Sequence, residues 1–143
     1  MNFREATVKD IPALSEVRQA VRENVLSDPR KVTREMFASY LCESGKGWLC
    51  EIEGEVVGFC VASLKDASIW ALFVKPSYEG RGIGKRFLRL ATEWLFETGA
   101  ESIALSTDAH TRADRFYEEQ GWQRGETRPD GEVCYRLNKP DRT

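Results

Sequence analysis

The sequence predicts a mixed α/β (α+β) domain whose elements follow one another in the order β-α-α-β-β-β-α-β-α-β-β. Three observations lead to this fold class. An almost uninterrupted apolar run over residues 69–74 is typical of a strand covered on both faces. A glycine-rich turn follows, and it leads into a strongly amphipathic helix over residues 82–97. The 143 residues suffice for a domain with its own core, so we predict a single domain over residues 1–143.

The first third of the chain is predicted to contain one strand and two helices. Residues 2–7 are expected to form a short strand. Asp10 is expected to be the N-cap of a helix that has Pro12 in its first turn. The apolar face of this helix is predicted to consist of Ile11, Leu14, Val17 and Val21. A second helix is expected to start near Thr33 and to end near residues 45–47.

The middle of the chain is predicted to contain a hairpin followed by the apolar strand. Residues 48–52 and 56–63 are the two strands of the hairpin, and the turn between them is Glu53-Gly54-Glu55. The strand over residues 69–74 is expected to end before Pro76, because proline has no backbone N–H to donate to a neighbouring strand.

The last part of the chain is predicted to begin with a β-α-β unit. The helix over residues 82–97 is followed by a strand over residues 102–106, which makes residues 69–106 a right-handed parallel crossover. A last helix is expected over residues 110–120, and a closing hairpin over residues 122–137. The charged residues of the last helix are interpreted as a solvated face: Arg112, Asp114, Arg115, Glu118 and Glu119.

The bulk composition excludes several classes of protein. The net charge is −2, with 21 basic and 23 acidic residues, whereas a protein that follows nucleic-acid phosphates carries a basic surplus. No apolar run is long enough to span a bilayer, and the first residues lack the pattern of a secretory signal. We therefore expect a cytoplasmic protein with no nucleic-acid and no membrane partner.

The cysteines and the single histidine make a poor metal site. Cys42, Cys50, Cys60 and Cys134 form no Cys-x-x-Cys pair, and His110 is the only histidine. We expect no metal, and we interpret the cysteines as reduced thiols that lie mostly in buried strands.

The glycine-rich turn Glu79-Gly80-Arg81-Gly82-Ile83-Gly84-Lys85 is a candidate phosphate site. The first N–H groups of the helix that follows have no partner within the helix, and its macrodipole places positive charge at that end. Glycines at positions 80, 82 and 84 remove the side chains that would keep an anion away. The turn is therefore suited to hold a pyrophosphate, and Arg81 and Lys85 could add charge.

Two common phosphate motifs do not fit this turn. A P-loop requires glycine where Glu79 stands and Ser or Thr where Arg86 follows the lysine. A dinucleotide fingerprint requires a final glycine where Lys85 or Phe87 stands, depending on the starting glycine.

A third motif fits. Arg81-Gly82-Ile83-Gly84, placed after an apolar strand and before an amphipathic helix, resembles the acetyl-CoA loop of the GNAT superfamily of N-acetyltransferases, which reads Gln/Arg-x-x-Gly-x-Gly/Ala. Glu79 stands at the first position of that loop. We expect it to be tolerated because the loop binds mainly through backbone N–H groups, with the carboxylate turned to solvent or to Arg81.

A second segment extends the resemblance, which covers nearly the whole chain and is closest to bacterial single-domain members. Residues 111–122 resemble the family segment Asn-x-x-Ala-x-x-Leu/Phe-Tyr-Glu-x-x-Gly-Phe, with His110 at the Asn position and Trp122 at the final Phe. The matching residues are Ala113, Phe116, Tyr117, Glu118 and Gly121.

The resemblance implies a fold and a function. The fold is a mixed, mostly antiparallel sheet of six to seven strands flanked by four helices. The function is transfer of the acetyl group of acetyl-CoA to a primary amine of a small molecule or peptide, by direct attack in a ternary complex. The alternative is a non-catalytic acyl-CoA-binding or regulatory module on the same fold. A homodimer is compatible with either function.

The resemblance also implies site residues. Tyr117 is the expected catalytic acid for the leaving thiolate, and an N–H near Val74 or Phe73 is expected to polarise the thioester carbonyl beside a distortion of the strand. His110 is either a helix-start or loop residue with no catalytic role, or a contact to the substrate or to a water relay. The general base is left open between Glu51, Asp66, Asp108, Glu132 and a water relay. The expected cofactor-binding residues are Leu72, Phe73, Val74, Gly80, Arg81, Gly82, Ile83, Gly84, Lys85, His110, Ala113 and Phe116.

Overall fold

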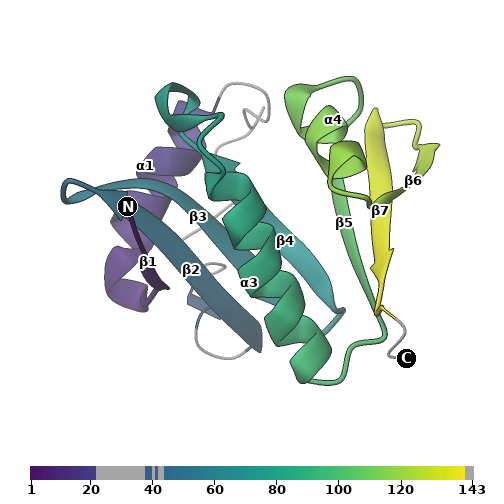
Figure 1. Ribbon diagram of the computed structural model, residues 1–143, viewed down its shortest axis with the longest axis horizontal. Coiled ribbons are helices and arrows are strands. Elements are labelled where there is room, and N and C mark those ends of the chain that lie inside the picture. Colours follow the sequence, from purple (N-terminus) through teal and green to yellow (C-terminus); the bar gives the residue numbers. More distant parts are fainter. Residues whose placement is uncertain (22–37, 40, 42–43, 141–143) are drawn as a thin grey trace.

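The computed structural model describes residues 1–21, 38–39, 41 and 44–140. Seven strands form one sheet in the order β1-β2-β3-β4-β5-β7-β6 (Figure 1). The strands are β1 (Asn2–Glu5), β2 (Gly45–Ile52), β3 (Glu55–Ser63), β4 (Ser68–Val74), β5 (Ser102–Asp108), β6 (Gln123–Thr127) and β7 (Glu132–Asn138). All neighbouring pairs are antiparallel except β4 and β5, which are parallel. The predicted mixed, mostly antiparallel sheet is confirmed.

The described residues contain three α-helices rather than the four expected. They are α1 (Ile11–Ala20), α3 (Ile83–Glu97) and α4 (Arg112–Glu119), with short 3-10 turns η1 (Val8–Asp10) and η4 (Pro76–Tyr78). The second helix, predicted from Thr33, falls almost entirely outside the described residues.

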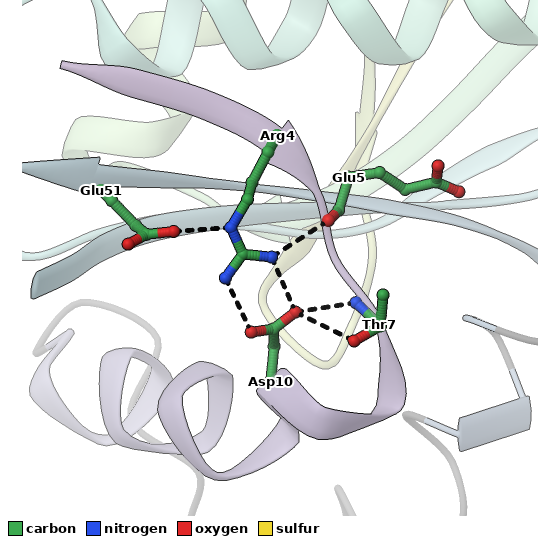
Figure 2. A network of polar contacts seen from close by, with 5 residues as sticks. All are labelled: Arg4, Glu5, Thr7, Asp10 and Glu51. Carbon is green, nitrogen blue, oxygen red and sulfur yellow. Dashed lines mark hydrogen bonds and ion pairs between the residues drawn. The ribbon is translucent and has the colours of Figure 1, made fainter. Parts of the chain in front are cut away.

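The start of α1 differs from the prediction in the role of Asp10. Its side chain makes no cap hydrogen bond to α1. Instead, Asp10 Oδ2 accepts the backbone N–H of Thr7 at 2.9 Å, because a 3-10 turn precedes the helix. Arg4 of β1 donates to both oxygens of Asp10 and, through Nε, to Glu51 of β2 at 2.6 Å (Figure 2). One guanidinium thus fastens the first turn of α1 to two strands of the sheet.

A hairpin connects β2 and β3, as predicted, but its bounds differ. Glu55 begins β3 and is not part of the turn, and residues 45–47, expected at the end of the second helix, begin β2. Glu53 and Gly54 both have positive φ, 52° and 81°. Two consecutive left-handed residues define the type I′ turn that suits the twist of a two-residue hairpin.

Helices cover the sheet from opposite faces. The α3 side is filled by a core that includes Ile83, Phe87 and Leu95 of the helix, together with Val57 and Cys60 of β3. The α1 side is filled by Leu14 and Val17 with alternate residues of the same strands, among them Leu49, Phe59, Val61 and Phe73. In Figure 1, α3 and α4 lie in front of the sheet and α1 lies behind it. The strand over 69–74 is therefore covered on both faces, as predicted.

The junction between β4 and β5 interrupts the sheet. In the part of the chain that the structure describes, the two strands are paired at one position, Ser68 with Ala104. Beyond it they diverge toward the end of the molecule where α3 begins (Figure 1). The register of β4 against β3 shifts where Val61 faces Ala71 and Ala62 faces Ile69, which makes Trp70 the extra residue of a β-bulge. The expected strand distortion is present, just before Leu72 rather than at residues 72–74.

Candidate active site

A cleft occupies the opening between β4 and β5. It is bounded by the last residues of β4, by the glycine-rich turn with the start of α3, and by α4. It brings together most of the site residues predicted from the sequence: Leu72, Phe73, Val74, Gly80, Gly82, Ile83, Gly84, Lys85, Ala113, Phe116 and Tyr117. Residues from two segments more than 25 positions apart in the sequence thus share one pocket.

Glycine is required at two positions of the turn and favoured by packing at a third. Gly80 and Gly82 have φ of 80° and 82°, a region that side chains disfavour. Gly82 is the N-cap of α3. A Cβ on Gly84 would lie 3.3 Å from the ring of Phe116, so glycine lets α4 approach the helix start closely. These features leave the first N–H groups of α3 open toward the cleft.

The charged residues of the turn are paired differently from the expectation. Glu79 binds Arg112 of α4, with Nε and Oε2 3.1 Å apart, and does not bind Arg81. The Arg81 guanidinium lies over the ring of Tyr78 at 5.0 Å. Arg112 and Glu79 both line the cleft. The carboxylate of Glu79 is thus paired with a cation from the opposite wall of the cleft.

The backbone of β4 presents alternate groups to the cleft. Lys75 N–H donates to Val57 O of β3, and Phe73 O lies 3.0 Å from where a Cβ of Gly58 would be. Because alternate residues of a strand direct their backbone groups to opposite neighbours, residues 73 and 75 face β3. The N–H groups of Leu72 and Val74 therefore face the opening, which favours Val74 over Phe73 as the donor to a thioester carbonyl.

A buried ion pair holds α4 in place. Asp114, 6% exposed, accepts two hydrogen bonds from Arg124 of β6, at 3.0 and 2.9 Å. It also accepts the Tyr135 hydroxyl of β7 and the His110 backbone N–H. The Arg124 guanidinium, with the Tyr135 hydroxyl, holds the pKa of the Asp114 carboxyl well below its usual range. The prediction of a solvated face was wrong at Asp114, because three elements converge on its carboxylate.

Tyr117 lies one turn after Asp114 on the buried side of α4. The residue is 6% exposed, and its ring packs against Phe116, Trp122 and Tyr135 at 5.2 to 6.0 Å between centroids. Burial raises the pKa of its hydroxyl, and the nearby Cys60 thiol adds to the shift. The hydroxyl therefore remains protonated at neutral pH and can donate a hydrogen bond. No described residue forms a hydrogen bond with it.

Two predicted contacts do not lie in the cleft. Arg81 is exposed and rests on Tyr78. His110 is also exposed, with φ of 64°, and its backbone N–H binds Asp114. In this structure His110 forms the left-handed turn that precedes α4. Its role toward a cofactor stays a prediction.

None of the four candidate bases belongs to the described lining of the cleft. Glu51 binds Arg4, Asp66 accepts the Ser68 hydroxyl at 2.8 Å, and Glu132 binds Arg128. The carboxylate that does line the cleft, Glu79, is engaged by Arg112. The described walls thus offer backbone groups, a tyrosine hydroxyl and cations.

Residues 1–21 and 44–140, with the few described between them, contain no group of three or more His, Cys, Asp or Glu side chains arranged to hold a metal ion. None of the helices in this part of the chain is long and apolar enough to cross a membrane.

Three residues of the cleft were not predicted from the sequence. Val21 follows the C-terminus of α1, Tyr78 belongs to η4, and Arg112 begins α4. Arg112 occupies a variable position of the second motif, and Val21 had the pattern of an ordinary core residue. No local signal separates them from their neighbours, because what selects them is their position across the cleft.

The sequence is similar to known protein families and proteins. A family model described as "Acetyltransferase (GNAT) family" matches residues 14–122. The uncharacterized N-acetyltransferase YhfO of Bacillus subtilis (strain 168) is 28% identical over 151 residues, which cover 98% of this chain and 99% of that protein.

Solved structures share the fold. The PaiA N-acetyltransferase from Thermoplasma acidophilum, in complex with coenzyme A, has a TM-score of 0.81 at 18% identity, with 96% of this chain and 98% of that chain covered. The ribosomal-protein-S18-alanine N-acetyltransferase from Escherichia coli has a TM-score of 0.76 at 20% identity, with 96% and 92% covered. At these identities the likeness concerns the fold.

Proposed function

The chain belongs to the acetyltransferase (GNAT) family, and on that premise we propose that it transfers the acetyl group of acetyl-CoA to a primary amine. The observation that carries the proposal is the cleft between β4 and β5. It joins an anion-binding helix start, unpaired backbone groups of a strand and a buried tyrosine hydroxyl in one pocket. These are the parts that a thioester with a long diphosphate-bearing arm requires.

The cofactor is proposed to extend along the cleft from the turn to β4. Its pyrophosphate accepts N–H groups of residues 82–84 at the start of α3, where the helix dipole favours an anion. The pantetheine arm lies beside Leu72 and Val74, whose backbone groups face the opening. Coenzyme A in the PaiA structure supports this use of the shared fold.

The chemistry is proposed to be direct attack in a ternary complex. The amine nitrogen attacks the thioester carbon, the carbonyl oxygen accepts the Val74 N–H, and the C–S bond breaks to release coenzyme A. A tyrosine hydroxyl ordinarily has a higher pKa than a thiol, about 8.5, and burial raises the pKa of Tyr117 further. Its hydroxyl therefore stays protonated and stabilises the departing sulfur as a hydrogen-bond donor. The proton lost by the amine leaves through ordered water, since the described lining holds no free carboxylate.

Two measurements on the purified protein test the proposal. Acetyl-CoA at millimolar concentration should raise the melting temperature by mass action, whereas ATP and NAD should not. Thiol release should then depend on an amine, over a panel of simple amines, amino acids and peptides. A melting shift without thiol release on any amine would favour the non-catalytic acyl-CoA-binding module, and no shift would contradict cofactor binding.

Substitution of Tyr117 tests the mechanism. Tyr117→Phe should lower kcat about 100-fold because the leaving sulfur loses its donor. The dissociation constant of acetyl-CoA, measured by calorimetry, should change less than twofold. Unchanged kcat would remove Tyr117 from the mechanism, and a loss of affinity equal to the loss of kcat would assign it to binding.

A further inference from the structure

Arg18 places a cation against the wall of the cleft. It lies in the last turn of α1, and its guanidinium carbon is 4.5 Å from the centroid of the Phe73 ring. Phe73 lines the cleft, as does Val21, whose backbone N–H binds Arg18 O. Arg18 itself is not among the lining residues, but its guanidinium packs on the ring of one of them.

Arg18 has no acidic partner among the described residues. Its Nε is buried and makes no hydrogen bond within the part of the chain that the structure describes. By contrast, Arg4 binds Asp10 and Glu51, and Arg124 binds Asp114. The acid on the same helix, Glu16, is directed to Lys75 at 3.4 Å.

An unpaired and partly buried guanidinium is unfavourable unless something compensates for it. Removal from water weakens its hydration, and the Phe73 ring replaces that hydration only in part. Burial lowers the pKa of Arg18, but an arginine in a protein remains protonated at neutral pH. The Arg18 side chain therefore stays charged, and a bound anion would replace the hydration that the guanidinium loses on burial.

Arg18 also lies on the side of the sheet opposite the phosphate turn. Phe73 and Val21 belong to the α1 core, whereas the start of α3 belongs to the other face. The cleft contains residues from both faces because β4 and β5 are separated there. A cofactor held at the turn would leave the α1 side of the same opening available to the second substrate.

We propose that Arg18 binds a carboxylate of the amine acceptor, so that the protein acetylates amino acids or compounds with an amino-acid-like end. This inference rests on the proposed acetyltransferase function and specifies its substrate class. A planar guanidinium matches a carboxylate with two parallel hydrogen bonds, which fix the orientation of the acceptor as well as its position. Phe73 beneath the guanidinium keeps that plane in place.

Matched acceptors test the inference on the whole protein. Each of several amino acids is compared with its carboxamide and with its decarboxylated amine, at saturating acetyl-CoA, by thiol release. The wild-type protein should prefer the acid by about tenfold or more in kcat/KM, because only the acid satisfies the guanidinium. Arg18→Met should raise KM for the acid and bring the three acceptors within about twofold of one another. Arg18→Lys should retain an intermediate preference, because lysine keeps the charge without the planar fork.

Controls separate recognition from folding. Arg89→Met changes an arginine on the outer side of α3, with a side chain 73% exposed, and should keep the preference for acids. The melting shift produced by acetyl-CoA should be the same in wild type and Arg18→Met. If Arg18→Met does not fold, the test compares wild type with Arg18→Lys, using the ratio of kcat/KM for the acid to kcat/KM for the carboxamide. An equal ratio in the two proteins overturns the carboxylate site.

The outcomes distinguish the two proposals. Wild-type turnover of amines or carboxamides equal to that of the acids, or an unchanged preference in Arg18→Met, overturns the carboxylate site and leaves the acetyltransferase function standing. Absence of thiol release with every member of the three sets contradicts the acetyltransferase function itself, and the carboxylate site with it.

Discussion

The two walls of the cleft are built by different means. The α3 wall is made by backbone geometry: Gly80 and Gly82 adopt left-handed φ, and the helix start presents its N–H groups. The α4 wall is made by side chains: Asp114 is bound by Arg124 and Tyr135 from two strands of the closing hairpin. The first wall depends on a few consecutive residues, and the second depends on residues brought together from 21 positions apart.

The α3 wall is therefore expected to bind the cofactor, and the α4 wall to position Tyr117. Changes in the α3 wall should alter cofactor affinity while the fold remains intact. Changes in the α4 wall should alter stability first, because the same carboxylate fixes the helix that carries Tyr117. The following substitutions test this division, in order of decreasing effect.

Asp114→Asn should have the largest effect. It removes the charge that Arg124 and Tyr135 bind within a buried environment, and the free energy of unfolding should fall by about 2 kcal/mol. Urea unfolding measures it. Asp130→Asn, in the exposed turn of the hairpin with a side chain 59% exposed, should stay within about 0.5 kcal/mol of wild type. Equal losses in the two variants would show that the buried network does not hold α4.

The difference in the free energy of unfolding between wild type and Asp114→Asn should depend on pH. The folded-state pKa of Asp114 is depressed, so its contribution is fully present above the unfolded pKa of about 3.9 and is lost as pH falls below it. The stability difference between wild type and Asp114→Asn should be constant from pH 5 to 7 and narrow below about pH 4. A difference that persists unchanged to pH 2 would contradict the ion pair.

Gly82→Ala should have an intermediate effect and should act on affinity. At φ of 82° an alanine costs about 1–2 kcal/mol or forces the helix start to change, so the dissociation constant of acetyl-CoA should rise about tenfold. Gly131→Ala is the matched control, because Gly131 has φ of 87° in the turn between β6 and β7. Its stability loss should be similar and its affinity unchanged; equal affinities in both variants would contradict the phosphate site.

Glu79→Gln should have the smallest effect. It removes a carboxylate from the mouth of the cleft, so acetyl-CoA should bind about threefold more tightly at low salt, and less so at 0.5 M salt where charges are screened. Calorimetry at two salt concentrations measures this change. Glu93→Gln, on the exposed side of α3 with a side chain 65% exposed, should leave affinity unaltered. Weaker binding in Glu79→Gln would instead show that Glu79 positions Arg112 for the cofactor.

The division between the walls also explains what could be predicted from the sequence. The glycine turn, the helix that follows and the order of the strands depend on local patterns, and the structure agrees with them closely. The helix boundaries differ by one or two residues, and Asp10 acts one turn earlier than expected because a 3-10 turn precedes α1. These features need only neighbouring residues to form.

The remainder depends on residues that are distant in the sequence. Three roles require knowledge of what lies opposite a residue. Arg112 pairs with Glu79, Asp114 is a buried anchor, and Arg18 is a cation with no acidic partner among the described residues. A charged helix residue looks the same in sequence whether it faces water or the end of a strand. The pairing of side chains across the cleft could therefore not be predicted from the sequence, whereas the backbone conformation of the turn could.

The separation of β4 from β5 has a consequence for self-association. Unpaired strand backbones usually lie at the outer borders of a sheet, where they invite strands of other chains. Here Leu72 and Val74 form such a border inside the molecule, between two helices that stand over it (Figure 1). On that side the next strand of the sheet is β5, so a foreign strand about 4.8 Å from β4 would have to fit between β4 and β5. The unpaired backbone groups of β4 are thus flanked by β5 of the same chain instead of forming an outer edge of the sheet.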